Sequence, residues 1–275
     1  MADAINLSQS VRTNLLTLQR TSDLISTTQT RLSTGKKVNS AIDDAPAFFT
    51  ARALSNSASD LDSLKSNIDL AISTIQSAID GIDAITELVN QAKGLASNAK
   101  ATGDTNERST LAVQFNELLS QIDTIANDSS FNGTNLLQAS PDNLAVEFNS
   151  ANTSNLTITG LDATTASTGI NIAVAANNFG LNANIDTALT AISSALTTLR
   201  SNASTMGSNN TILSTRLNFT ENLVNTLEGG EGKLTLADLN EESANLLALQ
   251  TRQQLGINSL ALAAQSERSI LALFG

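Results

Sequence analysis

The chain has 275 residues, of which 41% are apolar but only 3% aromatic, and its formal net charge is −11. It contains no His, Cys, Trp or Tyr, so the usual general base, thiol nucleophile and soft metal ligands are all missing. We therefore predict no catalytic, metal or cofactor site, and the acidic balance disfavours nucleic acid and anionic membranes as partners.

Neither end of the chain has the pattern of a membrane segment. The start, Met1–Ala4, is not followed by a basic region and an apolar run, so we expect no cleaved secretory signal. The apolar tail from Leu255 to Phe274 is interrupted by Gln265, Glu267 and Arg268. Because a membrane span needs about twenty mostly apolar residues, we expect no membrane insertion.

Helical periodicity begins near the amino terminus. Residues spaced alternately by three and four positions would line one face of a paired helix. A first seam of this kind is broken by polar residues and consists of Val11, Leu15, Leu18, Ser22, Ile25, Gln29 and Leu32.

Longer and more apolar seams flank the middle of the chain. One consists of Leu61, Leu64, Ile68, Ala71, Ile75, Ala78, Ile82, Ile85, Val89, Ala92 and Ala96, and a shorter one of Leu111, Phe115, Leu118, Ile122 and Ile125. A third consists of Ile185, Leu189, Ile192, Leu196, Leu199, Ala203, Met206, Asn210, Leu213, Leu217, Thr220, Val224 and Leu227. Each buried Leu, Ile or Val contributes about 1.5–3 kcal/mol before entropy is subtracted, so these helices predict a stable bundle.

The segment from Pro141 to about Gly180 is rich in Asn, Thr, Ser and Gly. Apolar and polar residues alternate around Leu144–Phe148 and again around Leu156–Thr159, which predicts a short β-hairpin. We expect one further strand near Ile170, Ile172 and Val174.

The C-terminal seam is also interrupted by polar residues. Its members are Leu236, Leu239, Ser243, Leu246, Gln250, Gln253, Ile257, Leu260, Ala264, Glu267, Leu271 and Phe274. Polar seam positions reduce stability while favouring one register and one partner. We therefore expect both ends of the chain to be loose in the monomer and to become ordered between neighbouring copies.

Four segments, in their order along the chain, resemble bacterial flagellin. They are RLSTGKKVNSAIDDA at Arg31–Ala45, SFNGTNLL at Ser130–Leu137, LADLNEESA at Leu236–Ala244, and QQLG at Gln253–Gly256 together with SILAL at Ser269–Leu273. Each segment alone has a simpler explanation, such as a helix end or a turn. In this order they extend the resemblance over nearly the whole chain, and they imply a short flagellin without large outer domains.

The resemblance implies a mainly α fold in which long antiparallel helices form a coiled-coil terminal domain and a helical rod domain with a small β-hairpin region. The implied order is a terminal-domain helix at 1–43, the first half of the rod at 44–140, an outward-facing hairpin segment at 141–184, the second half of the rod at 185–232 and a second terminal-domain helix at 233–275. It also implies a filament subunit that is exported unfolded and polymerises with itself in the extracellular flagellum. Implied partners are a flagellar secretion chaperone, the filament cap and hook-associated junction proteins.

For assembly we predict eight residues as contacts within or between the terminal helices: Leu15, Leu18, Ile25, Leu32, Leu246, Ile257, Leu260 and Leu271. Pro46 stands where the resembling family more often has a small residue. We expect its ring to stiffen the connector after the first helix and to push Ala45 toward an extended conformation.

Three alternatives are weaker. A hook–filament junction protein would resemble flagellin at both ends but would not polymerise. A helical signalling or adaptor coiled coil would need a sensor, an anchor or a charged partner-specific edge, none of which is apparent. A filament-borne metallopeptidase would need a His-Glu-x-x-His site, which a chain without His cannot form.

Overall fold

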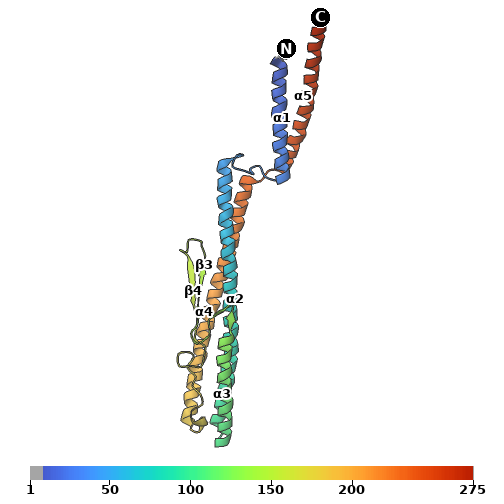
Figure 1. The fold of residues 1–275 in the computed structure, drawn as a ribbon. Helices are drawn as coiled ribbons and strands as arrows, with labels where there is room; N and C mark the ends of the chain where they lie inside the picture. Colours follow the sequence, from blue (N-terminus) through green and yellow to red (C-terminus); the bar gives the residue numbers. More distant parts are fainter. Residues whose placement is uncertain (1–8, 275) are drawn as a thin grey trace. The chain divides into compact units, whose positions relative to one another are not determined.

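The structure is a computed structural model that describes residues 9–274, without the side chains of residues 267 and 270–274. It is mainly helical, as predicted. The helices are α1 (Gln9–Thr34), α2 (Ala45–Ala101), α3 (Thr105–Asp128), α4 (Asn182–Thr235) and α5 (Leu239–Phe274), with a short 3₁₀ helix η1 (Ala176–Phe179) before α4 (Figure 1).

The chain divides into two compact units. Unit 1 combines the two ends of the chain, Met1–Ser57 and Thr226–Gly275, and unit 2 is the continuous segment Ala58–Asn225. The boundaries between the units fall inside α2 and α4, so each of these helices contributes residues to both.

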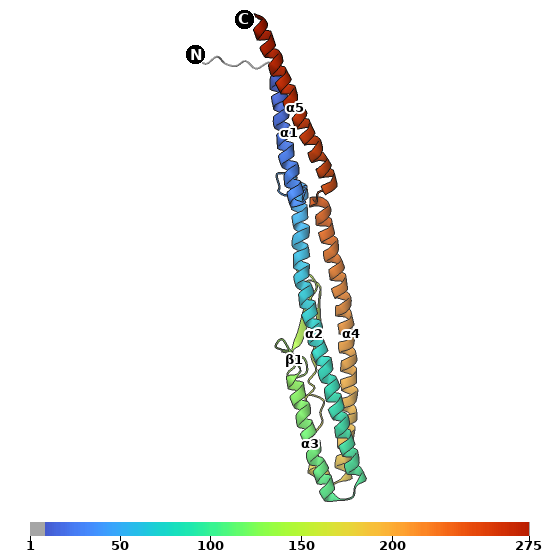
Figure 2. The same ribbon diagram turned by 90° about the vertical axis from the view of Figure 1, so that its right-hand side faces the viewer.

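Unit 2 is a bundle in which α2, α3 and α4 lie side by side (Figures 1 and 2). The long seam predicted on α2 is confirmed, because every member from Leu64 to Ala96 is buried. Phe115 and Ile122 of α3 and Ile185 of α4 belong to the same hydrophobic core. Regular burial of aliphatic side chains along all three helices stabilises the rod, and Phe115 of α3 adds an aromatic side chain to this core.

Two small antiparallel hairpins follow α3. The first pairs β1 (Ser130–Phe131) with β2 (Thr134–Asn135) around a two-residue turn at Asn132 and Gly133, whose φ values are 49° and 80°. The second pairs β3 (Asn143–Glu147) with β4 (Asn155–Thr159) and confirms the hairpin predicted from the alternating pattern.

The β3–β4 hairpin packs one face on the bundle. Val146 and Ile158, which point to the same face, are buried. At the end of β3, the guanidinium carbon of Arg216 on α4 lies 4.9 Å from the centre of the Phe148 ring. A cation–π contact of this kind adds to the apolar packing that holds the hairpin.

The further strand predicted near Ile170, Ile172 and Val174 is wrong: the described residues 160–175 contain no strand. Asn171 has a φ of 54°, which interrupts an extended backbone, and the N–H of Ile172 donates to the carbonyl of Thr165 at 3.1 Å within the loop. Ile170 and Ile172 are buried, but Val174 is 67% exposed. The alternation therefore reflects loop burial rather than pairing in a sheet.

Candidate assembly site

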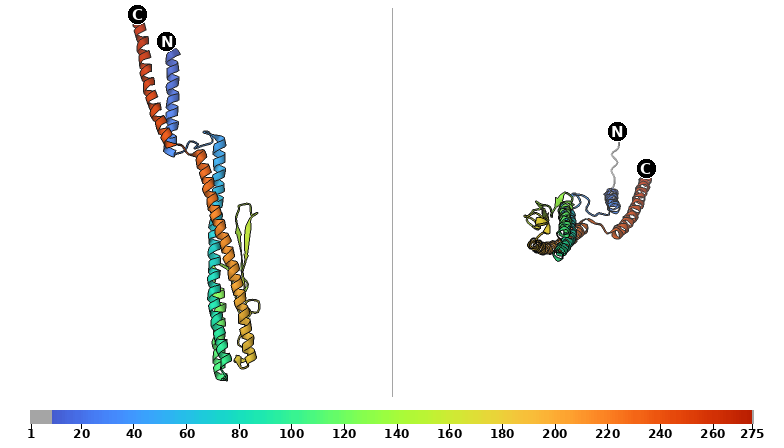
Figure 3. Two further views of the ribbon diagram at one scale, coloured as in Figure 1. Left: turned by 180° about the vertical axis from the view of Figure 1, so that it is seen from behind. Right: turned by 90° about the horizontal axis from the view of Figure 1, so that it is seen from below.

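The terminal helices α1 and α5 of unit 1 pack against each other along their length (Figures 1 and 3). Apart from Arg31, the least exposed positions on α1 are Val11, Asn14, Leu18, Thr21, Ile25, Thr28 and Leu32, and on α5 they are Glu242, Leu246, Leu249, Gln253, Gly256, Leu260 and Ala263. These sets alternate in steps of three and four, the spacing of a coiled-coil seam. We call these two sets the inner seam.

The inner seam buries little apolar surface for its length. Thr21 and Thr28 are only 3% and 5% exposed, so they occupy positions where Leu or Ile would contribute more. A methyl group added to Gly256 would lie 2.8 Å from Cδ2 of Leu18, so the missing side chain allows the helices to approach closely. Close packing of small and polar residues makes this pairing weaker than that of the rod helices.

The predicted assembly residues separate into two groups. Leu18, Ile25, Leu32, Leu246 and Leu260 all lie in the inner seam. Leu15 and Ile257 do not, and they are 42% and 48% exposed. The side chain of Leu271 lies outside the described residues.

The inner seam also differs from the sequence-based one at alternate positions. On α1 the structure buries Thr21 and Thr28 where the pattern predicted Ser22 and Gln29. At these two positions both neighbours are polar, so no apolar signal in the sequence distinguishes the two registers. Gly256 replaces Ile257 in the seam because only the residue without a side chain fits against Leu18.

A second apolar surface on α5 has no partner within the described chain. Leu247, Leu255 and Leu262 are 68%, 64% and 72% exposed, and helical geometry places each of them about 130° away from the inner seam. We call these three residues the outer stripe. The eight assembly residues predicted from the sequence do not include them, although a spacing of eight and seven residues is close to a helical repeat. On α1, Leu16 and Leu24 are also about half exposed.

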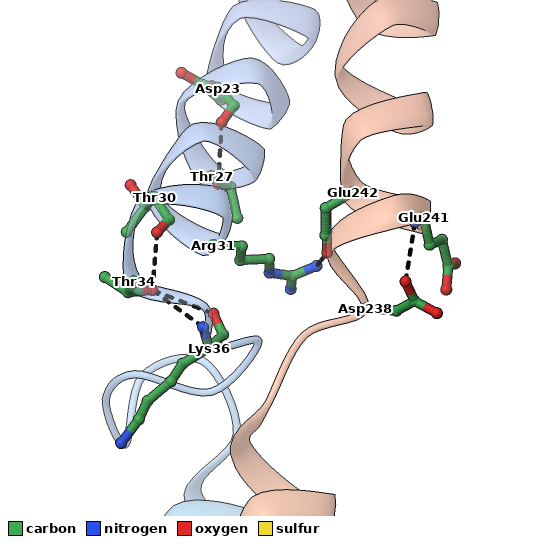
Figure 4. A network of polar contacts seen from close by, with 9 residues as sticks. All are labelled: Asp23, Thr27, Thr30, Arg31, Thr34, Lys36, Asp238, Glu241 and Glu242. Carbon is green, nitrogen blue, oxygen red and sulfur yellow. Dashed lines mark hydrogen bonds and ion pairs between the residues drawn. The ribbon is translucent and has the colours of Figure 1, made fainter.

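Near the base of the pair, an ion pair joins the two helices. Arg31 Nη1 lies 2.9 Å from Glu242 Oε1, and Figure 4 shows the arginine reaching across from α1 to α5. The Glu242 side chain is only 10% exposed, so this pair is less screened than a surface ion pair. Asp238 caps α5 by accepting hydrogen bonds from the N–H groups of Asn240 and Glu241.

Main-chain hydrogen bonds connect the segment after α1 to the segment before α5. Gly35 has a φ of 69° and ends α1, with its N–H donating to the carbonyl of Arg31 at 2.8 Å. The N–H of Lys37 donates to the carbonyl of Thr235 at 2.7 Å, and the N–H of Ala237 donates to the carbonyl of Gly35 at 2.9 Å. We call these two connected segments, residues 35–49 and 235–239, the joint.

A turn within the joint is held by one carboxylate. Asp43 Oδ2 accepts hydrogen bonds from the backbone N–H groups of Ser40 at 2.9 Å and Asn39 at 3.0 Å, and from the Ser40 hydroxyl. These hydrogen bonds favour the ionised carboxylate and hold the pKa of Asp43 below its usual value, and the two bonds from backbone N–H groups have the largest effect.

The expectation for Pro46 is wrong. Asp44 caps α2 by accepting a hydrogen bond from the N–H of Ala47 at 3.0 Å, and α2 already begins at Ala45. Pro46 therefore lies in the first helical turn, where a backbone N–H has no partner within the helix and its absence costs nothing. The proline favours the start of α2 instead of stiffening the connector.

Neither a metal cluster nor a membrane-spanning helix is found among the described residues. They contain no group of three or more Asp or Glu side chains arranged to hold a metal ion. None of the described helices is long and apolar enough to span a membrane.

Comparison with known proteins identifies this architecture. The family model for the N-terminal helical region of bacterial flagellin matches residues 5–142, and the model for the C-terminal helical region matches residues 189–274. The chain belongs to the bacterial flagellin family. Flagellin FljK of Caulobacter vibrioides is 34% identical, over 99% of this chain and 98% of its own. A flagellin of Brucella melitensis is 29% identical, over 98% of this chain and 99% of its own.

The crystal structure of Bacillus cereus flagellin is similar over 56% of this chain and 88% of its own, with 20% identity and a TM-score of 0.48. Membership of the flagellin family makes this chain a structural subunit of a flagellar filament, and the full-length match to relatives of the same size agrees with a short flagellin.

Proposed function

We propose that this flagellin polymerises through the outer stripe of α5 together with Leu15, Leu16 and Leu24 of α1, while the inner seam holds the two helices of one subunit together. The observation that supports this most is the exposure of the outer stripe, at 64–72% for each leucine. Burying such a side chain against another copy contributes about 1–2 kcal/mol, and the contribution repeats at every subunit.

We further propose that the pairing of α1 with α5 is marginal in the free monomer and is completed by docking. In α1, six threonine hydroxyls donate to the carbonyl four residues earlier: Thr13, Thr17, Thr21, Thr27, Thr30 and Thr34. β-Branched residues are weak helix formers, and this bonding pattern slightly destabilises and bends helices. A helix of this composition needs packing to persist, which delays its ordering until a neighbour is present.

In this proposal the protein is exported, functions in the extracellular filament and has no catalytic role. A secretion chaperone would cover the outer stripe before export, because exposed leucines on a partly ordered helix would otherwise associate too early. The filament cap and the hook-associated junction proteins would contact the same terminal unit at the two ends of the filament.

The direct test replaces exposed leucines of the outer stripe. In Leu255→Ser with Leu262→Ser, seeded assembly followed by sedimentation and electron microscopy should fall at least tenfold, while the circular dichroism of the monomer stays unchanged. The matched control is Leu181→Ser, which changes a residue of unit 2 that is 59% exposed. Filaments of normal length from the double variant would disprove the role of the stripe.

Two further measurements test the ordering of the ends. Hydrogen exchange should show α1 and α5 protected in the filament but not in the monomer, and equal protection in both states would contradict the proposal. Truncation after Leu255 should abolish polymerisation and leave the rod helices folded. Filaments of normal length from the truncated chain would contradict the proposal.

A further inference from the structure

We propose that the joint carries a second, separate contact with another copy of this chain, in which Ile42 and Phe49 of one subunit pack against Leu236 and Leu239 of the next. This inference rests on the filament role but does not depend on the outer stripe. Ile42 is 95% exposed and Phe49 is 62% exposed, and both lie on the first segment of the joint. On the second segment Leu236 and Leu239 are 55% and 49% exposed.

Single exposed apolar residues are common and usually need no explanation. These four differ because each segment of the joint carries two of them close together in sequence. They are the exposed large apolar residues described in unit 1 that lie outside the body of α1 and α5. The side chains thus form two short apolar groups, one on each segment, and each side chain remains about half exposed or more within unit 1.

The backbone that presents Ile42 is ordered by hydrogen bonds. The N–H of Ile42 donates to the Ser40 hydroxyl at 3.3 Å, and the N–H of Asp43 donates to the Ser40 carbonyl at 3.2 Å. The Asp43 carboxylate in turn accepts three hydrogen bonds from Asn39 and Ser40. An apolar side chain on such a fixed turn can dock without paying the entropy of ordering a loop.

Phe49 is presented with similar rigidity. It lies in the first turns of α2, which Asp44 caps, and its ring packs edge to face against Phe48 with centroids 5.6 Å apart. Leu239 is the first residue of α5 and follows the capping residue Asp238. Phe49 and Leu239 therefore stand at capped helix starts, whereas Leu236 directly follows the end of α4.

The distribution of charge favours a second copy as the occupant. Unit 1 carries nine Lys and Arg and ten Asp and Glu residues, whereas unit 2 carries six and sixteen. Almost all of the net charge therefore lies in unit 2, and copies of unit 1 can approach each other with little net repulsion. In a filament subunit a neighbouring copy is also the partner at the highest local concentration.

The two groups are different surfaces, so their contact is heterologous. A contact between the first segment of one subunit and the second segment of the next does not close on itself unless the rotation forms a ring. It can therefore propagate along a helical polymer, as a filament subunit requires.

Because the chain has no cysteine, a disulfide can report this contact without background. The variant Ile42→Cys with Leu239→Cys should form covalent ladders of two, three and more subunits when filaments are oxidised, and only monomers when dilute unassembled protein is oxidised. Each single-cysteine variant should give no product larger than a dimer. Filaments of the double variant that yield no ladder would overturn the pairing.

A second variant tests the energetic contribution. Ile42→Ser with Phe49→Ser should raise the critical concentration for seeded growth at least tenfold without lowering the melting temperature of the monomer. The matched control, Ile212→Ser with Phe219→Ser, changes residues of unit 2 that are 43% and 58% exposed and should leave growth unchanged.

The outcomes separate this inference from the proposed function. An unchanged critical concentration for the joint variant, alongside the loss of assembly in the outer-stripe variant, would overturn the joint contact and leave the stripe standing. If wild-type monomer bound phosphatidylcholine vesicles, and only that binding were lost in the joint variant, the surface would belong to a membrane contact and the inference would also fall.

Discussion

Asn135 offers the sharpest test of how unit 2 is held together. Its side chain is 4% exposed and makes four hydrogen bonds: Nδ2 donates to the carbonyls of Ala126 and Asn127, and Oδ1 accepts from the N–H groups of Leu137 and Gln138. The residue thus joins the last turn of α3 to the segment after the β1–β2 hairpin. Its own N–H donates to Asp142, so every polar group of Asn135 that points inward is satisfied.

Replacing Asn135 with Ala would leave two carbonyl and two N–H groups without partners. The bonds to Ala126 and Leu137 are buried, and each buried group that loses its partner costs about 1–3 kcal/mol. Adding the two partly buried bonds at lower values, we expect Asn135→Ala to destabilise unit 2 by about 3–5 kcal/mol. For a domain of this size the melting temperature should fall by roughly 10 °C.

Urea unfolding followed by circular dichroism would measure the loss. Asn135→Asp should be nearly as damaging, because it keeps the two acceptor bonds but places a carboxylate oxygen against two carbonyls. Gln138→Ala is the matched control, since that side chain makes one exposed hydrogen bond to Ser140 and its loss should cost less than about 0.5 kcal/mol. An unchanged urea midpoint for Asn135→Ala would refute the reasoning.

Three further predictions follow from the described contacts. Asn210→Leu should stabilise the monomer by about 1–2 kcal/mol in thermal unfolding, because Oδ1 of Asn210 is buried without a hydrogen-bond partner; equal or lower stability would contradict this. Gly81→Ala should destabilise the monomer by about 1–3 kcal/mol, because the added methyl group would clash with Ser129 Oγ. Gly94→Ala is the control: it has open space around the added methyl group and should be neutral or stabilising by about 0.5–1 kcal/mol. The lowered pKa of Asp43 means that the contribution of its carboxylate to stability is present above the unfolded pKa near 4 and is lost as the pH falls through the folded pKa. Because the Ser40 hydroxyl donates one of the hydrogen bonds that lower this pKa, carbon-13 NMR should find the pKa of Asp43 raised in Ser40→Ala. An unchanged pKa in this variant would contradict the prediction.

Much of the rod could be predicted from the sequence because its apolar residues leave no alternative register. On α2 the predicted seam has no polar member, and shifting it by one residue would bury charged side chains. The buried positions Ile68, Ile75 and Ile82 therefore coincide with the predicted ones. The β3–β4 hairpin was predictable for the same reason, since alternation over five residues selects one face of a strand.

Local motifs were recognisable, but their roles were not. The segment around Asn132 and Gly133 indicated a turn, yet the sequence did not reveal that Asn135 would cap α3. The sequence alone places Pro46 in a connector, because it does not show that a helix capped by Asp44 begins at Ala45.

By itself, the sequence determined the long rod helices, the hairpin and the presence of weak helical seams at both ends, because dense apolar periodicity allows only one buried face. Only the tertiary structure decided which face of α1 and α5 is used within a subunit. Polar residues such as Thr21 and Thr28 are buried there, and Gly256 occupies the place of closest approach. Steric fit, rather than hydrophobicity, selects that seam, and for this reason Leu247, Leu255 and Leu262 remain on the outside.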